Sequence, residues 1–413
     1  MPVNSTSDAA GPQSSSLEGQ SVSAKKPRES AAVGHMPVLD GIRGIAILAV
    51  LLFHFITPEN RDGLVNSTVS WVFSYGALGV DLFFVLSGFL ITGILYDARS
   101  DEHYFRNFYM RRLLRIFPLY YGVLIVIFLV LPLVPALRGS ELSGLRAYQA
   151  WAWLYAVNIY LAIHDGWVLS YIEHFWSLAV EEQFYLIWPL AVWLLASKPR
   201  VFLTFSFLVA AASFIGRIVA SAAGAGPIVL EVLTPFQLDA LAVGGFFAVY
   251  LRQPGGEAGA RRLVVPLALA GLALLVVQLG GRHLTASGNA LESLRGGAFH
   301  LLLAALMLKG LLGPASSGWT RCLLSRPLAF LGKYSYGLYV YHHFFSYYFS
   351  THRTDLMLAA RLGCSDMTAL VLQAGAGIAA SVAIAWLSYE FYEKHFLQLK
   401  RYWPSSHARI LRS

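Results

Sequence analysis

A series of apolar stretches constrains this chain more than any other feature. Each is about 20 residues long, the length that a helix needs to cross a bilayer. Eleven candidates are centred near residues 48, 85, 124, 155, 186, 211, 240, 271, 304, 339 and 378. Hydrophobic residues make up 56% of the chain and charged residues only 13%, about half the charged share of a soluble protein. We therefore expect an all-α integral membrane protein.

The candidate over residues 147–163 is the weakest, because it is short and contains Gln149 and Asn158. If it does not cross and the N-terminus is cytoplasmic, most loop Lys and Arg residues fall inside, as membrane proteins prefer. The sequence therefore predicts a bundle of about ten transmembrane helices, with both termini cytoplasmic, in the cell inner (plasma) membrane. Residues 147–163 become a re-entrant or interfacial element. Cys322 and Cys364 then lie on opposite sides and should not pair.

The two ends of the chain are polar. Residues 1–35, rich in Ser and Ala, are predicted to be a disordered cytoplasmic tail. Residues 36–397 form the predicted membrane domain, and residues 398–413 a basic cytoplasmic tail without a further soluble domain. The net charge of +8 is explained by cytoplasmic Lys and Arg, so lipid is an expected partner and nucleic acid is not.

Charge inside a span needs a partner or a function. The stretch LDGIRGIAILAVLLFHF, residues 39–55, contains Arg43 and His54. Eleven residues turn a helix by three turns and about 20°, which places both on one face about 16 Å apart. A packed histidine and an arginine reaching to the membrane surface would be the structural explanation. Their shared face favours a functional pair.

Carboxylates occur at a comparable depth in HFWSLAVEEQFYLIWP, residues 174–189, where Glu181 and Glu182 lie about two turns into a span that starts outside. A carboxylate and an imidazole at one depth, here Glu181 and His54, are the components of an acid/base pair. The sequence does not decide whether they touch.

A basic segment, FYMRRLLRIFPLY over residues 108–120, precedes a span on the predicted cytoplasmic side. Membrane anchoring is a sufficient explanation for Arg111. Arg112 and Arg115 lie one turn apart on one helix face, a spacing that suits a ligand with several phosphates such as coenzyme A.

Further intramembrane polar residues are Asp81, Ser87, Asp239 and His342. Each could simply hold helices together. Ser87 lacks the sharp turn of a hydrolase nucleophile. Few acidic residues and only two cysteines are present, so no metal site is predicted.

Six motifs in a fixed order resemble the acyltransferase 3 family of membrane O-acyltransferases. They are LDGIRGIAILAVLLFH, GVDLFFVLSGFLIT, RRLLRIFP, WSLAVEEQFYLIWP, LDALAVG and LGKYSYGLYVYH, and they extend from residue 36 to about residue 400. The resemblance implies transfer of an acyl group, usually acetyl, from cytoplasmic acyl-CoA to a hydroxyl, typically of an envelope or exported glycan. It implies acyl-CoA, in the first place acetyl-CoA, as the donor, a carbohydrate or other hydroxyl acceptor, and no tightly bound cofactor.

The resemblance also assigns roles to residues. Arg43, His54 and Glu181 would be catalytic, and Arg112 and Arg115 would bind acyl-CoA. Asp81, Ser87 and His342, which the resemblance does not itself assign, are predicted to contact the substrate. Some members carry a fused esterase-like domain, and this chain is expected to stand alone. Two positions depart from the family: Gln237 stands where an Arg often precedes Asp239, and Glu393–Lys394–His395 lacks the usual proline.

These roles combine into a hypothesis of an acyl relay across the membrane. Arg112 and Arg115 would hold the CoA phosphates, and Arg43 would guide the thioester. His54 would be a general base or a transient acyl carrier, oriented by Glu181. Two other classes stay open: a multi-span transporter of glycan or acyl groups without transfer chemistry, and a non-catalytic scaffold. The acceptor, the acyl chain and the oligomeric state are not predicted.

Overall fold

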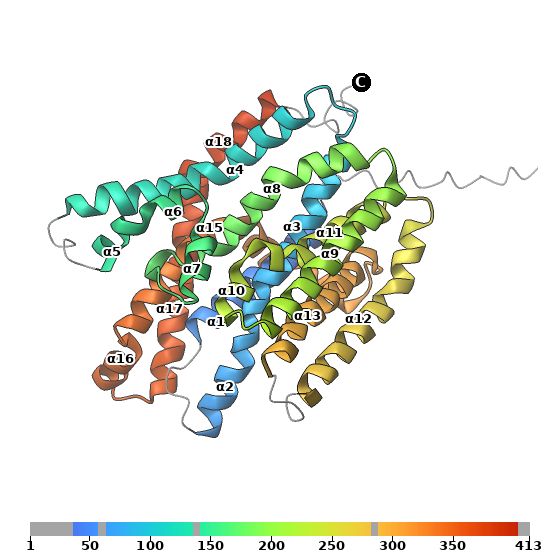
Figure 1. Ribbon diagram of the computed structural model, residues 1–413. Helices are drawn as coiled ribbons and strands as arrows, with labels where there is room; N and C mark the ends of the chain where they lie inside the picture. Colours follow the sequence, from blue (N-terminus) through green and yellow to red (C-terminus); the bar gives the residue numbers. More distant parts are fainter. Residues whose placement is uncertain (1–35, 57–62, 135–140, 282–287, 404–413) are drawn as a thin grey trace, which may run out of the picture. The chain divides into compact units, whose positions relative to one another are not determined.

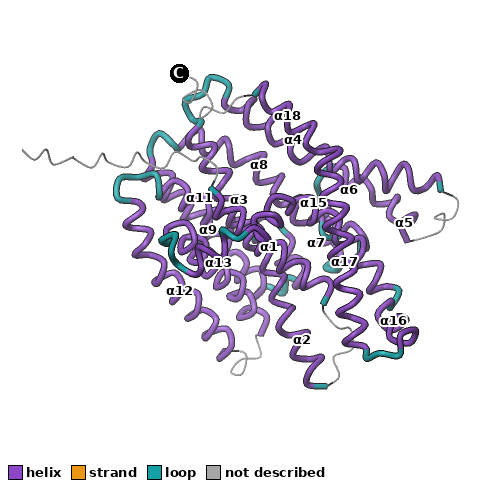
Figure 2. Tube along the Cα trace, turned by 180° about the vertical axis from the view of Figure 1, so that it is seen from behind, coloured by secondary structure: helices purple, strands orange, loops and turns teal. Residues whose placement is uncertain are grey.

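The computed structural model describes residues 36–56, 63–134, 141–281 and 288–403. Every regular element in these ranges is helical (Figures 1 and 2). The predicted tail over residues 1–35 and residues 404–413 of the second tail lie outside the described residues. The first residues of the second tail continue the helical chain as far as Tyr402.

The α-helices, joined in places by short 3₁₀ and π segments, are α1 (Pro37–Phe55), α2 (Leu64–Ser74), α3 (Leu78–Asp97), α4 (Tyr104–Ile125), α5 (Glu141–Gly144), α6 (Gln149–Trp153), α7 (Val157–His164), α8 (Phe175–Leu195), α9 (Pro199–Ala222), α10 (Pro227–Val232), α11 (Leu238–Tyr250), α12 (Gly256–Gly281), α13 (Gly288–Leu312), α14 (Gly318–Leu323), α15 (Arg326–Thr351), α16 (Thr354–Leu362), α17 (Asp366–Ser388) and α18 (Lys394–Gln398).

Eight helical segments among the described residues are long and apolar enough to cross a membrane, and each contains the centre of a predicted span. The other two predicted spans correspond to α11 and α15. Helix α11 has only 13 residues. Helix α15 has 26 residues but is rich in Tyr and His. The all-helical, multi-span class is thus confirmed, whereas the number ten stays a prediction.

Residues 147–163 form two short helices rather than one long one. Helix α6 has 5 residues and α7 has 8, and Tyr155 between them has a positive φ of 52°. Neither piece is long enough by itself to cross a bilayer. A re-entrant or interfacial position of this segment stays a prediction. Both cysteines are unpaired.

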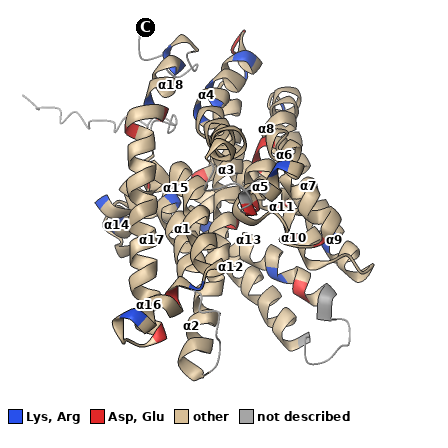
Figure 3. Ribbon diagram, turned by 90° about the vertical axis from the view of Figure 1, so that its left-hand side faces the viewer, with Lys and Arg blue, Asp and Glu red and all other residues tan. Residues whose placement is uncertain are grey.

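The outward faces of several helices are apolar. On α12 the side chains of Val265, Leu269 and Val276 are 60–69% exposed, and in Figure 3 most of the ribbon carries neither Lys, Arg, Asp nor Glu. In water such faces would be unfavourable, but in lipid they are the expected surface. The exposed side chains therefore agree with a membrane environment.

Helix α1 packs against α3 and α15, α3 also packs against α8, α11 and α13, and α15 against α17 (Figure 1). Glycines allow these contacts to be close. A Cβ atom at Gly88 of α3 would lie 1.9 Å from the carbonyl oxygen of Leu241 on α11, and one at Gly244 would lie 2.1 Å from that of Val85. Small residues that let backbones approach are typical of helix contacts in membranes.

Replacing Gly88 by Ala is expected to push α3 and α11 apart and to lower stability, because overpacking a tight contact costs about 1–3 kcal/mol. The measurement is the midpoint of thermal unfolding in detergent. Gly375→Ala is the matched control, since its Cβ would meet nothing within 4 Å. Equal midpoints for the two variants would contradict the close-contact argument.

Candidate functional site

A cavity of about 110 Å³ lies between α1, α3, α4, α8 and α15. Its size is enough for several waters or a short acyl group. Five residues predicted from sequence line it, together with two that the sequence did not assign to the site, Glu182 and Tyr185. The predicted five are Arg43, Ser87, Arg112, Arg115 and Glu181. We call this space the arginine cavity.

Glu181 lies in the arginine cavity with Ser87 and Tyr185, whose hydroxyl groups are close to its carboxylate. The Ser87 and Tyr185 hydroxyls are themselves 2.5 Å apart, and Arg43 and Arg112 lie close enough to interact with the carboxylate electrostatically. Among the described residues no hydrogen bond joins Glu181 to His54. The surroundings of Glu181 in this cavity are a serine, a tyrosine and two arginines, and its orientation of His54 stays a prediction.

Arg112 and Arg115 face the same cavity, as their spacing predicts. The Arg112 guanidinium lies 5.9 Å from the ring centre of Tyr185, and Arg43 donates a hydrogen bond of 3.2 Å to Asp40 one turn away on α1. Three guanidinium groups around one space form a site that suits an anion. In contrast, Arg111 donates to the backbone carbonyls of Lys400 and Trp403, in agreement with a structural role.

His54 lies outside the arginine cavity, in a group that we call the histidine cluster: His54 of α1, His174 at the start of α8, and His342 and His343 of α15. The ring centre of His54 is 4.8 Å from that of His342 and 5.3 Å from that of His343. His174 is 4.7 Å from His343 by the same measure. The structure thus brings together His54 and His342, which the sequence predicted separately, and adds two histidines that the sequence analysis passed over.

A pair of hydroxyl groups separates the arginine cavity from the histidine cluster. Ser177 and Tyr339 line the cavity, and their oxygens are 2.5 Å apart. The Tyr339 hydroxyl also donates to the carbonyl of His174 at 3.0 Å, and the Tyr339 carbonyl accepts a hydrogen bond from His342 at 2.7 Å. The two sites are therefore one layer of side chains apart.

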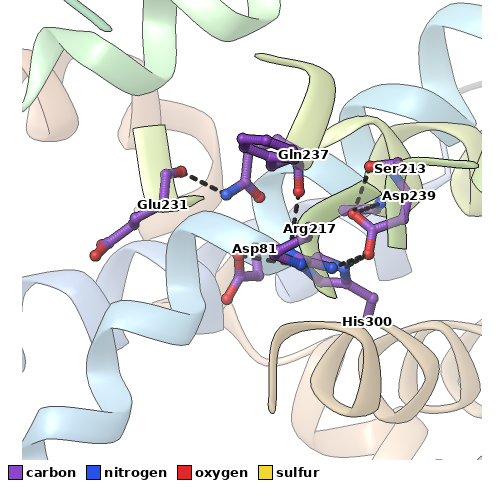
Figure 4. Close-up of polar contacts among 9 residues, drawn as sticks. Asp81, Ser213, Arg217, Glu231, Gln237, Asp239 and His300 are labelled. Carbon is purple, nitrogen blue, oxygen red and sulfur yellow. Dashed lines mark hydrogen bonds and ion pairs between the residues drawn. The ribbon is translucent and has the colours of Figure 1, made fainter. Parts of the chain in front are cut away.

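A third polar group, the acidic network, lies between α3, α9, α11 and α13 (Figure 4). His300 is 3.4 Å from the Asp81 carboxylate and 2.9 Å from that of Asp239. Arg217 pairs with Asp239 and also donates to the carbonyl of Phe236. Asp81 therefore does not line the arginine cavity, and its contact with the substrate stays a prediction.

Arg217 also explains a departure from the family pattern. Gln237, where an Arg often occurs, donates instead to the backbone of Glu231, and the guanidinium that pairs with Asp239 comes from another helix.

Burial, together with the charge of Asp81, raises the pKa of Glu231 in the connecting helix α10 to about 7.

Replacing Asp239 by Asn is expected to destabilise the protein by about 3–5 kcal/mol, because it leaves the buried Arg217 without its counter-charge. Lys394→Gln removes an exposed ion pair with Glu390 and should cost at most about 1 kcal/mol. Thermal unfolding of both variants measures the difference. Similar midpoints would contradict a structural role for the acidic network.

The residues that sequence reasoning missed carry weak local signals. His343 directly follows His342, and His174 is the first residue of the motif HFWSLAVEEQFYLIWP. Arg217 and His300 each stand in a helix that is long and apolar enough to cross a membrane. An intramembrane ionisable residue is a functional candidate by default, so this rule alone would have marked both.

Comparisons with known proteins indicate the family of this chain. The family model described as an acyltransferase domain, acyltransferase 3, matches residues 36–390. YrhL of Bacillus subtilis, named provisionally as a peptidoglycan O-acetyltransferase, is 30% identical over 325 residues, which are 75% of this chain and 48% of YrhL. The O-acetyltransferase OatA of Staphylococcus aureus is 28% identical over 324 residues, 75% of this chain and 50% of OatA.

The peptidoglycan O-acetyltransferase OatA of Listeria monocytogenes is 34% identical over 163 residues, which are 38% of this chain and 24% of that protein. The chain spans about half the length of the first two relatives. No solved structure matches it significantly. With the family model covering most of its length, and with residues from five of the six ordered motifs lining one cavity, the chain belongs to the acyltransferase 3 family of membrane proteins.

Proposed function

We propose that this protein is a membrane O-acyltransferase that moves an acyl group, in the first place acetyl, from acyl-CoA to a hydroxyl of an envelope or exported glycan. The single observation that carries the proposal is the arginine cavity, where three arginines and two glutamates meet one side-chain layer from the histidine cluster. The names of the relatives make peptidoglycan the first acceptor to test.

The donor would bind in the arginine cavity. Arg112 and Arg115 are placed to pair with phosphates of coenzyme A, since guanidinium groups bind phosphate oxygens in a bidentate manner. Arg43 would direct the thioester inward. The proposal includes ten spans in the inner membrane, with α11 and α15 added to the eight apolar segments. Both termini would lie in the cytoplasm, and acyl-CoA would enter from that side.

The acceptor hydroxyl would be activated at His54. Its Nδ1 lies 3.0 Å from the carbonyl of Val50, which favours the tautomer with a proton on Nδ1 and a lone pair on Nε2. A general base needs that lone pair, and so does an acyl carrier. His342, beside it, would contact the acceptor, and Ser87 and Glu181 would contact the donor end.

Membranes that contain the protein, supplied with radiolabelled acetyl-CoA and a crude envelope-glycan fraction, test this function. Alkali-labile label in the glycan is expected only when the protein is present, with membranes lacking it as the control. If the protein is instead a transporter of glycan or acyl groups, or a scaffold, the purified protein in vesicles should form no ester. Equal labelling with and without the protein would reject the enzymatic proposal.

Replacing Arg43 by Lys is expected to lower the transfer rate at least about tenfold, since lysine keeps the charge but loses the planar fork that hydrogen-bonds Asp40. The measurement is the initial rate at saturating acetyl-CoA. Arg326→Lys at the start of α15 is the control. An unchanged rate would reduce Arg43 to a membrane anchor.

A further inference from the structure

The histidine cluster contains ring nitrogens that the rest of the fold leaves without partners. Each of the four imidazoles has one ring nitrogen within hydrogen-bond distance of a backbone carbonyl oxygen. For Nδ1 of His54 it is the carbonyl of Val50, and for Nδ1 of His342 that of Tyr339. For Nε2 of His343 it is the carbonyl of Ser170, and for Nε2 of His174 that of Val340. The carbonyl must accept, so that nitrogen carries the proton. The other nitrogen of each neutral ring then has only a lone pair.

Those lone pairs are buried. Within the described part of the chain, Nε2 of His342 and Nδ1 of both His343 and His174 have no hydrogen-bond partner. The His342 residue is fully buried, and His343 is 6% exposed. Buried polar atoms in folded proteins are nearly always satisfied, and an exception calls for a ligand or another explanation.

Three of the rings are close enough to share one ligand. One ring nitrogen each from His54, His342 and His343 lies within 4.8 Å of the other two. Nitrogens bound to a tetrahedral zinc ion at about 2.0–2.1 Å lie about 3.3 Å apart. Ring shifts of about an ångström would therefore close the site.

We propose that His54, His342 and His343 bind one divalent transition-metal ion, with Zn²⁺ as the best match. Imidazole nitrogens suit zinc, and a three-histidine site leaves a fourth position open, as in catalytic zinc centres. His54 is only partly buried, so the open position has a route to a ligand from outside the cluster. The sequence analysis predicted no metal site because acidic residues and cysteines are few. Histidines that come together from distant helices leave no local pattern in the sequence.

The surroundings of the three rings fit the same assignment. Metal-bound histidines usually donate their second ring N–H to a backbone carbonyl or a carboxylate, which fixes the tautomer. All three ligands do so here, and the Glu173 carboxylate lies 3.6 Å from Nε2 of His343. His174 remains a neighbour whose lone pair faces the same group of rings.

This inference deepens the proposed function and rests on it only for its chemical role. An acceptor hydroxyl bound at the open position would lose its proton more readily. Its oxygen would then form the new bond to the thioester carbonyl carbon as the carbon–sulfur bond breaks, and the coenzyme A thiolate would leave and take up the proton that the hydroxyl has lost. His54 would in that case act as a metal ligand rather than as a base or an acyl carrier.

The test uses the full chain, purified in detergent through an affinity tag without histidines, stripped with a chelator, and dialysed against Zn²⁺. Elemental analysis should find about one zinc per chain, and Co²⁺ in its place should give the visible absorption of four-coordinate cobalt. His342→Ala and His343→Ala should each weaken zinc binding at least about tenfold. His352→Ala, at the exposed end of α15, should bind zinc like the original chain.

Thermal unfolding in chelator checks that the variants are folded, and His343→Gln serves as a milder substitution. Zinc should raise the unfolding midpoint of the original chain and of His352→Ala but not of the cluster variants. No zinc in the original chain, or equal zinc in all variants, would overturn the metal site. Glycan acetylation by a chain that binds no metal would leave the proposed function intact, whereas zinc binding without acetylation would sustain the site and reject that function.

Discussion

His54→Ala should lower the rate of acetyl transfer to glycan by about 10²–10⁴-fold, the usual contribution of a group that activates a hydroxyl. The Michaelis constant for acetyl-CoA should change little, because His54 does not line the arginine cavity. The measurement is the initial rate of formation of alkali-labile label, at matched amounts of protein in the membrane. Added imidazole should restore part of the rate if the residue acts as a base.

The control for this variant is His164→Ala, because His164 ends the short helix α7 and belongs to none of the three polar groups. A transfer rate equal to that of the original chain would remove His54 from the reaction. The next candidate would then be His342, whose ring is adjacent.

The double change Arg112→Ala with Arg115→Ala should raise the Michaelis constant for acetyl-CoA at least about 100-fold, since two interactions are lost. Each hydrogen bond between charged groups contributes about 1.5–3 kcal/mol, and both guanidinium groups line the same cavity. The dependence of the rate on acetyl-CoA concentration gives the constant directly.

A thioester without phosphates separates this effect from damage to the fold. The acetyl thioester of N-acetylcysteamine should be used equally well by the original chain and by the double variant, since it offers no phosphate to either. Arg111→Ala is the matched control, because its guanidinium is engaged with backbone carbonyls of the C-terminal segment. An unchanged constant for acetyl-CoA in the double variant would reject phosphate binding by this pair.

Much of the architecture follows from local properties of the chain. Each span depends on the summed hydropathy of about 20 neighbouring residues, a sum that can be read without knowing the fold. For the same reason, Arg43, His54 and Glu181 could be recognised as unusual, since each stands in an apolar stretch. The spacing of Arg112 and Arg115 placed them on one helix face, and the structure has both in one cavity.

Hydropathy was less informative where a helix is short or polar. Helix α11 has 13 residues, and α15 contains the aromatic and histidine residues that line both sites. A span that faces other helices does not need to be apolar on every side. Its average hydropathy therefore underestimates its capacity to lie inside a bundle.

The sequence by itself determined that the chain is a helical membrane protein and which spans carry ionisable groups. Only the tertiary structure decided which of these groups meet. Glu181 shares a cavity with Ser87 that His54 does not line, Asp81 meets His300, and His54 meets His342 from the other end of the chain. The physical reason is that helix periodicity fixes the face on which a residue lies, whereas the neighbour of that face is chosen by packing between helices that are far apart in sequence.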